Sequence, residues 1–145
     1  MAVEISANIE NLRIDDIHAM LSKVFWSPNI TKAEIMKGIK NSALVVGAYH
    51  DGTHQVGFLR AVSDKVRFAY LMDVVVHEDF RRQGIGQRMV NCALSHPELK
   101  DVYQWLLITK DAHGVYEKCG FAPLKNPEKW MSIMSLRPDR ADFIG

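Results

Sequence analysis

Residues 68–95 read FAYLMDVVVHEDFRRQGIGQRMVNCALS, and the rest of the chain is best interpreted around this stretch. Its first nine residues, 68–76, are rich in β-branched and aromatic side chains, which is typical of a strand buried on at least one face. A short charged loop follows, and then Arg-Arg-Gln-Gly-Ile-Gly at 81–86. Beyond this turn the apolar residues fall on one face of a predicted helix, at Ile85, Met89, Val90, Ala93 and Leu94.

A strand, a glycine-rich turn and a helix in this order predict an anion-binding site. Free backbone N–H groups at a helix N-terminus point in one direction, and the helix dipole adds partial positive charge. Gly84 and Gly86 allow a phosphate to approach closely, and Arg81 and Arg82 add full charges. The P-loop pattern GxxxxGK[ST] is absent, and the dinucleotide pattern GxGxxG fails because Met89 stands at its third glycine. Both common nucleotide-binding patterns are therefore disfavoured.

The composition indicates an ordinary globular protein, and we predict a single domain over residues 1–145. Lysine and arginine (18) nearly balance aspartate and glutamate (17), so the chain lacks the basic surplus of a general nucleic-acid or membrane binder. Cys92 and Cys119 show no CxxC spacing, and the N-terminus lacks an apolar signal region. These features predict a cytoplasmic protein, and no residue spacing indicates a metal site.

The remaining segments alternate between helical and strand patterns. Thr31 and Glu34 form a capping-box pattern at the start of a helix, and Asp51-Gly52 is a strong hairpin signal. Trp105 and Trp130 are expected in the core. We expect helices over 15–23, 31–41, 85–95 and 111–118, and strands over 2–9, 43–49, 55–63, 68–76, 105–109 and 130–136.

Two motifs in this order resemble the hallmarks of the GNAT acyltransferase superfamily. Arg-x-x-Gly-x-Gly at 81–86 is similar to its motif A, which holds the pyrophosphate of acyl-coenzyme A. Val-Tyr-Glu-Lys-Cys-Gly-Phe at 115–121 resembles the second hallmark, and one predicted strand separates the two. The resemblance covers most of the chain. It implies an α/β (α+β) GNAT fold: a mixed central sheet of about six to seven strands, mostly antiparallel with a splayed parallel pair, flanked by about four helices.

The resemblance also implies how acetyl-coenzyme A would bind as co-substrate. Backbone groups of the central strand would pair with the pantetheine amides and polarise the acetyl carbonyl. The following loop would hold the pyrophosphate, mostly through backbone N–H groups. Thr109 stands where many members carry asparagine, and Glu78 stands where many carry proline. The predicted cofactor-binding residues are Val74, Val75, Val76, Arg81, Arg82, Gln83, Gly84, Ile85, Gly86, Gln87 and Thr109.

Tyr116, in the second motif, is expected to be the general acid. Aminolysis of a thioester expels a thiolate, and a phenol within about 3 Å can protonate it or donate a hydrogen bond to it. In the family the equivalent tyrosine often lies near the sulfur of coenzyme A. The structural alternative is a core residue on a short helix, with its hydroxyl group meeting water.

Asp73 is the second predicted catalytic residue, because a carboxylate inside an apolar strand is costly unless it is paired. It would bind the acceptor amine or remove its proton. A structural hydrogen bond is the alternative role, and the base could instead be Tyr70, His77, Glu78 or a water relay. If Val74 and Val76 share one face of the strand, Asp73 and His77 lie on the other.

Three aromatic residues, Phe25, Trp26 and Tyr70, are predicted to contact the acceptor substrate. Phe25 and Trp26 lie in the segment that covers the acceptor pocket in the family, and core packing is the competing interpretation. Cys92 and Cys119 are expected to be helical or capping residues, not activated nucleophiles.

Together these features predict an N-acetyltransferase that moves the acetyl group of acetyl-coenzyme A to a primary amine by direct attack. A small-molecule amine is the expected acceptor; a protein lysine or N-terminus is the alternative. A non-catalytic sensor module that binds acyl-coenzyme A is the rival from a different class. No nucleic-acid or membrane partner is expected, since the chain lacks a basic surplus. A homodimer is left open, because members of the family often dimerise through terminal strands.

Overall fold

The predicted central strand is β4 (Phe68–Val76), and it lies in a five-stranded sheet of order β1-β2-β3-β4-β5. The computed structural model describes residues 2–135. β1 (Val3–Ser6), β2 (Leu44–His50), β3 (His54–Ser63) and β4 pair antiparallel with their neighbours. β4 then pairs in parallel with β5 (Gln104–Leu106). The mixed sheet with one parallel pair is therefore confirmed.

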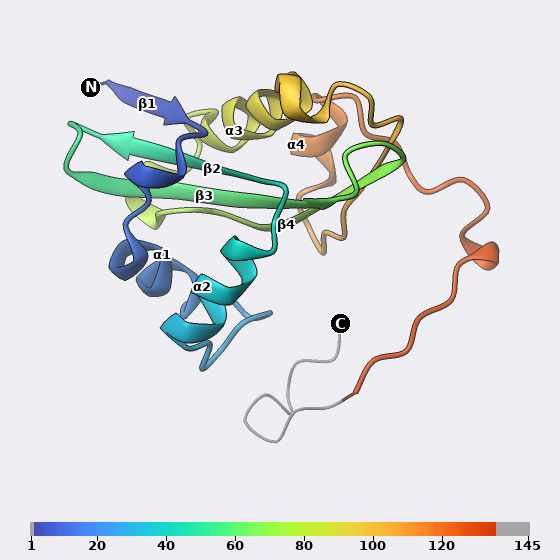
Figure 1. The fold of residues 1–145 in the computed structure, drawn as a ribbon, viewed down its shortest axis with the longest axis horizontal. Coiled ribbons are helices and arrows are strands. Elements are labelled where there is room, and N and C mark those ends of the chain that lie inside the picture. The colour runs from blue at the N-terminus through green and yellow to red at the C-terminus, as the bar shows by residue number, and fades with distance from the viewer. Residues whose placement is uncertain (1, 136–145) are drawn as a thin grey trace.

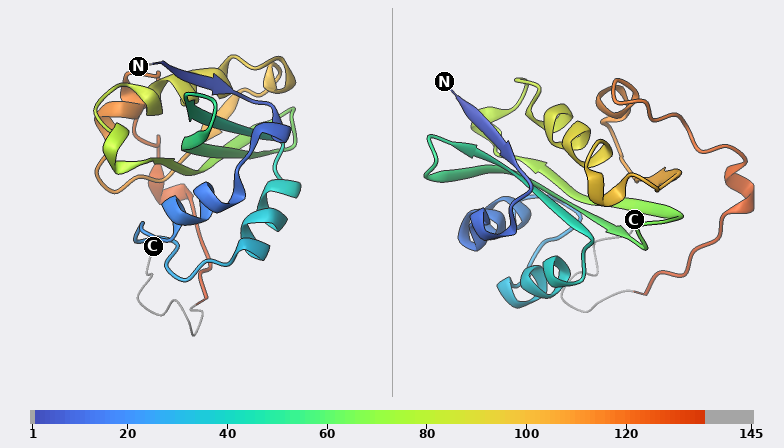
Figure 2. Two further views of the ribbon diagram at one scale, coloured as in Figure 1. Left: turned by 90° about the vertical axis from the view of Figure 1, so that its left-hand side faces the viewer. Right: turned by 45° about the horizontal axis from the view of Figure 1, so that its top comes forward.

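Helices cover both faces of this sheet (Figure 1). α1 (Ile14–Leu21) and α2 (Lys32–Lys40) lie on one face, and α3 (Ile85–Leu94) and α4 (His113–Glu117) lie on the other (Figure 2). Buried apolar residues accordingly form two clusters, one under α3 and one under α1 and α2. Four short 3₁₀ turns complete the described chain: Ile9–Asn11, Glu78–Phe80, Pro97–Leu99 and Pro127–Lys129.

Local signals in the sequence account for two of these elements. The Thr31 hydroxyl accepts from the Glu34 backbone N–H at 3.1 Å, and the Glu34 carboxylate accepts from the Thr31 N–H at 3.0 Å. This reciprocal capping box satisfies two otherwise unpaired donors at the start of α2. In the β2–β3 hairpin, Asp51 and Gly52 adopt φ of 54° and 67°. A tight hairpin turn requires these left-handed conformations.

β4 contains a bulge at Asp73, which has a positive φ of 57°. The pairing with β3 shifts between Phe58 and Arg60, so that one residue of β3 stands opposite two of β4. Before the bulge Leu71 packs under α3, and after it Val75 packs under α1 and α2. The bulge therefore exchanges the two faces of the strand, which puts Val74 on the α3 face.

The structure corrects the predicted C-terminal part of the sheet. The sheet has five strands, not six to seven, because residues 130–135 extend without a strand partner in the described chain; Leu136 lies outside the described residues. Trp130 is 45% exposed, so its assignment to the core is wrong, whereas Trp105 packs partly buried against the α3 cluster. β5 is also shorter than the predicted 105–109, since its pairing with β4 ends at Leu106.

Candidate active site

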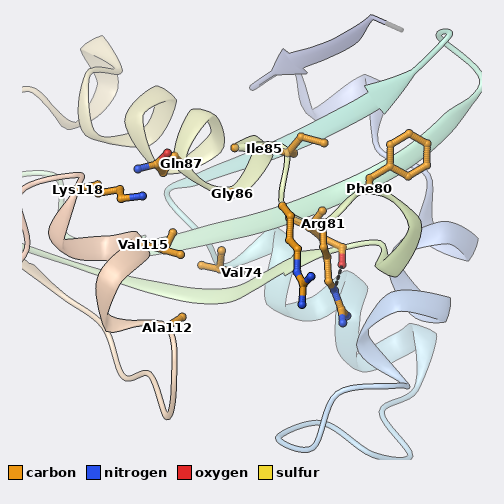
Figure 3. A pocket seen from close by; sticks show the side chains of 12 residues that line it. Val74, Phe80, Arg81, Ile85, Gly86, Gln87, Ala112, Val115 and Lys118 are labelled. Atoms are coloured by element: carbon orange, nitrogen blue, oxygen red, sulfur yellow. Dashed lines mark hydrogen bonds between the residues drawn. The ribbon is translucent and has the colours of Figure 1, made fainter.

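A cleft of about 460 Å³ opens between the second half of β4, the N-terminus of α3 and α4 (Figure 3). Its walls combine aliphatic side chains, glycines and three cations, and no acidic side chain lines it. The lining residues are Val74, Val76, Phe80, Arg81, Arg82, Gly84, Ile85, Gly86, Gln87, Ala112, Val115 and Lys118. The two segments that carry the sequence motifs therefore meet at one cleft.

The N-terminus of α3 opens into this cleft. Gly84 is the N-cap at φ 76° and ψ 11°, and no side chain caps the helix. The first residues of the helix, Ile85, Gly86 and Gln87, all line the cleft, and the first turn carries no acid. A Cβ at Gly86 would meet only Val76 Cγ2, at 3.9 Å. Uncapped N–H groups beside open space suit a bound anion.

The neighbouring edge of β4 is free of strand pairing. β5 pairs only with the first three residues of β4, so β4 has no neighbour on that side beyond Tyr70 among the described residues. The His77 N–H donates to the Val56 carbonyl at 2.7 Å. Because bonding directions alternate along an antiparallel ladder, the backbone groups of Val74 and Val76 face the open edge. The Val74 groups and the Val76 N–H are therefore available to pair with an extended ligand, whereas the Val76 carbonyl accepts from Arg81 Nε.

Three cations surround this polar backbone. Arg81 Nε donates to the Val76 carbonyl at 3.1 Å, which holds its guanidinium beside the strand edge. Arg82 adopts a left-handed φ of 65° in the turn. Arg81 lies at one end of the cleft and Lys118 at the other, with Val74 and Gly86 between them (Figure 3). The spread of charge suits a ligand that carries more than one phosphate group.

Tyr116 lies on α4 but does not line the cleft. Its ring packs edge-on against Phe121, with 6.0 Å between centroids, and it borders the α3 cluster. The helix ends in a Schellman arrangement: Phe121 N–H donates to the Tyr116 carbonyl at 3.1 Å, and Gly120 has a φ of 105°. Burial raises the pKa of the Tyr116 phenol, and the neighbouring Cys119 adds to the increase. The phenol therefore keeps its proton at neutral pH.

Asp73 lies on the opposite face from the cleft, beside Arg60 and Tyr70. Its carboxylate accepts from Arg60 Nε at 2.7 Å, and both side chains are largely buried. Burial raises the pKa of Tyr70, and the Asp73 charge raises it further. Asp73 therefore lies on the face of β4 opposite Val74 and Val76, as predicted. Its largely buried carboxylate is paired with Arg60.

The acceptor candidates Phe25 and Trp26 lie in the loop between α1 and α2. Their rings meet edge-on at 5.2 Å, and Phe25 is 55% exposed. The Lys110 ammonium lies 5.2 Å from the centroid of the Phe25 ring. This cation–π contact brings the α1–α2 loop beside the segment that joins β5 to α4.

Three predicted cofactor-binding residues do not line the cleft. Val75 points into the cluster under α1 and α2. The Thr109 hydroxyl accepts from the Ala112 N–H at 3.1 Å and so stabilises the turn before α4. Gln83 lies within the turn but outside the lining.

Sequence reasoning missed four lining residues: Phe80, Ala112, Val115 and Lys118. Lys118 lies inside the second motif, three residues after Val115. Its cationic side chain is the sequence feature that could have indicated a phosphate contact. Ala112 and Phe80 carry no chemical signal, because their position depends on how the loops fold.

Within residues 2–135, no three histidine, cysteine, aspartate or glutamate side chains are grouped as a metal site requires. No helix in that range is long and apolar enough to cross a bilayer.

The cleft combines a free strand edge, an uncapped helix N-terminus and three cations, and this combination suits an extended ligand that carries phosphate groups. The sequence profile of the acetyltransferase (GNAT) family matches residues 13–121. The chain therefore belongs to the GNAT family, whose general activity is acetyl transfer and whose usual co-substrate is acetyl-coenzyme A.

Individual relatives agree with this family. An uncharacterized N-acetyltransferase, ycf52, of Porphyra purpurea is 25% identical over 126 residues, which cover 84% of this chain and 71% of the relative. A crystal structure of a GNAT-family protein from Xanthomonas campestris matches with a TM-score of 0.87 and 33% identity, covering 99% of this chain and 97% of the other. A Staphylococcus aureus protein described as a probable acetyltransferase shares the fold, with a TM-score of 0.74 and 22% identity over 92% of this chain and all of the other.

Proposed function

We propose that this protein transfers the acetyl group of acetyl-coenzyme A to a primary amine on a small molecule. The cleft carries the proposal, because it joins an unpaired strand edge, an uncapped helix N-terminus and three cations in one place. The strand edge suits the pantetheine amides, and the cations suit the phosphates.

In the proposed reaction the neutral amine nitrogen attacks the thioester carbonyl directly. The new C–N bond forms, the C–S bond breaks, and the thiolate leaves with the electron pair. A backbone N–H of Val74 or Val76 would stabilise the developing oxyanion. Tyr116 would protonate the thiolate after a shift of its side chain toward the cleft, and its raised pKa keeps that proton available.

The acceptor amine would approach between β4 and the α1–α2 loop. Phe25 and Trp26 offer aromatic surface there, and Tyr70 borders the buried Asp73–Arg60 pair. Asp73 is the candidate to bind the ammonium form or accept the released proton. Because Asp73 already accepts from Arg60, we propose that Arg60 orients its carboxylate.

Calorimetric titration with acetyl-coenzyme A tests the binding step, with coenzyme A and NAD as controls. We expect micromolar binding of both coenzyme A species and none of NAD. Thiol release with a panel of small amines and of lysine-containing peptides then tests the acceptor class. Turnover of peptides alone would contradict the small-molecule assignment. Tight coenzyme binding without turnover of any amine would support a sensor instead.

A further inference from the structure

The loop between α1 and α2, residues 22–31, contacts the segments that follow β4 and β5. Its Lys23 ammonium lies 3.7 Å from the Glu78 carboxylate, just after β4. Two residues later in the loop, the Phe25 ring lies 5.2 Å from the Lys110 ammonium, which follows β5. The pairing of β4 with β5 ends before either contact. The loop therefore touches both sides of the gap that opens between these two strands.

Two charged pairs beside this gap are already neutralised. The largely buried carboxylate of Asp73 accepts from Arg60 Nε at 2.7 Å. Lys23 is the one charged residue of the loop at 22–31, and Glu78 is its partner. These pairs add no net charge to the side of the gap that faces α1 and α2, so an acceptor there meets mainly the charge that remains unpaired.

Lys110 carries that remaining charge. Its ammonium forms no ion pair with any of residues 2–135, and the adjacent Asp111 is exposed and forms none with it. The cation–π contact with Phe25 holds the ammonium beside the loop. A side chain that is already held in place loses less conformational freedom when it binds an anion. Lys110 is therefore a positioned cation without a counter-charge in the described chain.

Lys110 and Asp73 stand on opposite sides of the gap. The parallel ladder between β4 and β5 ends at the pair of Tyr70 and Leu106. Asp73 lies three residues beyond this pair on β4, and Lys110 lies four residues beyond it on the other side. Because the two strands run in the same direction, the two charged groups flank the gap at similar levels.

We propose that the acceptor amine also carries a carboxylate, and that Lys110 binds this carboxylate while the amine lies beside Asp73. The inference rests on the acetyl transfer proposed above and adds the chemical class of the acceptor. One ammonium group suits a carboxylate better than a phosphate, which has three strong acceptor oxygens to satisfy. Pairing with Lys110 also offsets the charge of the carboxylate, which would otherwise favour the ammonium form over the neutral amine that attacks the thioester.

Matched acids and amides test the inference. Thiol release is measured at saturating acetyl-coenzyme A with amino acids that differ in the spacing of amine and carboxylate, from glycine to γ-aminobutyrate, and with the amide of each. The ratio of kcat/KM for the acid to kcat/KM for its amide is compared between the wild type and Lys110→Gln, so that the different basicities of the two amines cancel. We expect this ratio to fall by about tenfold or more in the variant, because a hydrogen bond between charged groups is lost.

Two further variants separate recognition by Lys110 from a general effect of charge. Lys110→Arg keeps the cation and should restore most of the ratio. Lys100→Gln is the matched control, since Lys100 is also exposed but precedes β5, and it should leave the ratio unchanged. An equal fall in Lys100→Gln would overturn the assignment, because it would show that only the net charge of the protein matters.

The outcomes also distinguish this inference from the proposed function. An unchanged ratio in Lys110→Gln, or turnover of amides and simple alkylamines without turnover of any acid, would overturn the carboxylate and leave the transferase in place. Coenzyme binding without turnover of any amine would overturn the transferase, and the inference with it.

Discussion

At the scale of single residues, the roles of two tyrosines follow from their different surroundings. Tyr116 borders the core next to the cleft, with its phenol protonated because burial raises its pKa. Tyr49, on β2, is 7% exposed, and its hydroxyl has no hydrogen-bond partner among the described residues. Tyr116 is therefore a candidate acid. Tyr49 carries a buried hydroxyl group that has lost its contact with water and gains no hydrogen bond in return.

Tyr116→Phe should lower kcat by about 10²-fold or more and leave the affinity for acetyl-coenzyme A nearly unchanged. The ring remains to pack against Phe121, while the proton donor is lost. Because the pKa of Tyr116 is raised, kcat of the wild type should begin to fall only at a pH above the ordinary pKa of a phenol. The variant has no phenol at this position, so its kcat should not show this fall at alkaline pH. Equal losses in kcat and in affinity would indicate a purely structural role.

Tyr49→Phe should stabilise the protein or leave its stability unchanged, since it removes an unpaired buried hydroxyl. Burial raises the pKa of Tyr49 to about 12. The unfolded chain ionises first as the pH rises, so wild-type stability should be complete below about pH 10 and should fall by roughly 2–3 kcal/mol toward pH 12. Denaturant unfolding across this range measures both effects. A variant with the same alkaline loss as the wild type would contradict the assignment.

At the scale of elements, the N-terminus of α3 and the bulge of β4 build the site. The helix contributes uncapped N–H groups, and the bulge turns Val74 and Val76 toward them. Each element can be altered without removing the other.

Gly86→Ala should abolish measurable binding of acetyl-coenzyme A while the fold is retained. The added Cβ would meet only Val76 Cγ2 at 3.9 Å, and alanine favours a helix by about 1 kcal/mol over glycine. The methyl group would instead occupy space reserved for the phosphates. Gly114→Ala in α4 is the matched control, because Gly114 does not line the cleft and also has room for a Cβ. Unchanged affinity in Gly86→Ala would remove α3 from the binding site.

Asp73→Asn and Arg60→Gln together separate a chemical role of Asp73 from a structural one. Either substitution leaves a mostly buried charge without its counter-charge and should cost about 3 kcal/mol of unfolding free energy. Asparagine tolerates the left-handed φ of position 73, so the bulge should remain. If Asp73 handles the amine proton, Asp73→Asn should lose far more kcat than Arg60→Gln. Equal losses would assign Asp73 to positioning alone.

Prediction from sequence succeeded where a local pattern suffices. Residues 68–76 form β4 with the predicted bounds, and Thr31 and Glu34 cap α2 as expected, since both depend on neighbouring residues only. Of the predicted strand at 130–136, the described residues 130–135 do not join this sheet, because alternation gives strand propensity but no partner. The sequence motifs predicted the part of the cleft that β4 and the N-terminus of α3 form. Lys118 was missed because its position at the cleft depends on how α4 packs.

At the scale of the whole molecule, the cleft lies where three separately packed parts meet. β4 belongs to the sheet, α3 packs on one core cluster, and α4 follows the short β5. A ligand in the cleft would contact all three at once, and so would stabilise the whole fold and not one loop.

Acetyl-coenzyme A at about a hundredfold excess over its Kd should add about 2.7 kcal/mol to the free energy of unfolding. For a chain of 145 residues this corresponds to a rise in Tm of roughly 5–10 °C. Scanning calorimetry measures the shift, with NAD as the control that should give none. A Tm that does not respond to the coenzyme would show that the cleft does not bind it.

The bulge in β4 also has a genetic consequence. Most positions of a strand tolerate a change of side chain better than a change of length, but codon 73 should be an exception for deletion, because it lies at the extra residue of the bulge. Its in-frame deletion would restore regular alternation while keeping Val74 and Val76 toward the cleft and Val75 toward α1 and α2, whereas an added codon beside it would exchange the two faces. Among mutations in a library of this gene, we therefore expect single-codon deletions at codon 73 to be recovered with partial activity, as substitutions there are, and single-codon insertions between codons 73 and 74 to be absent.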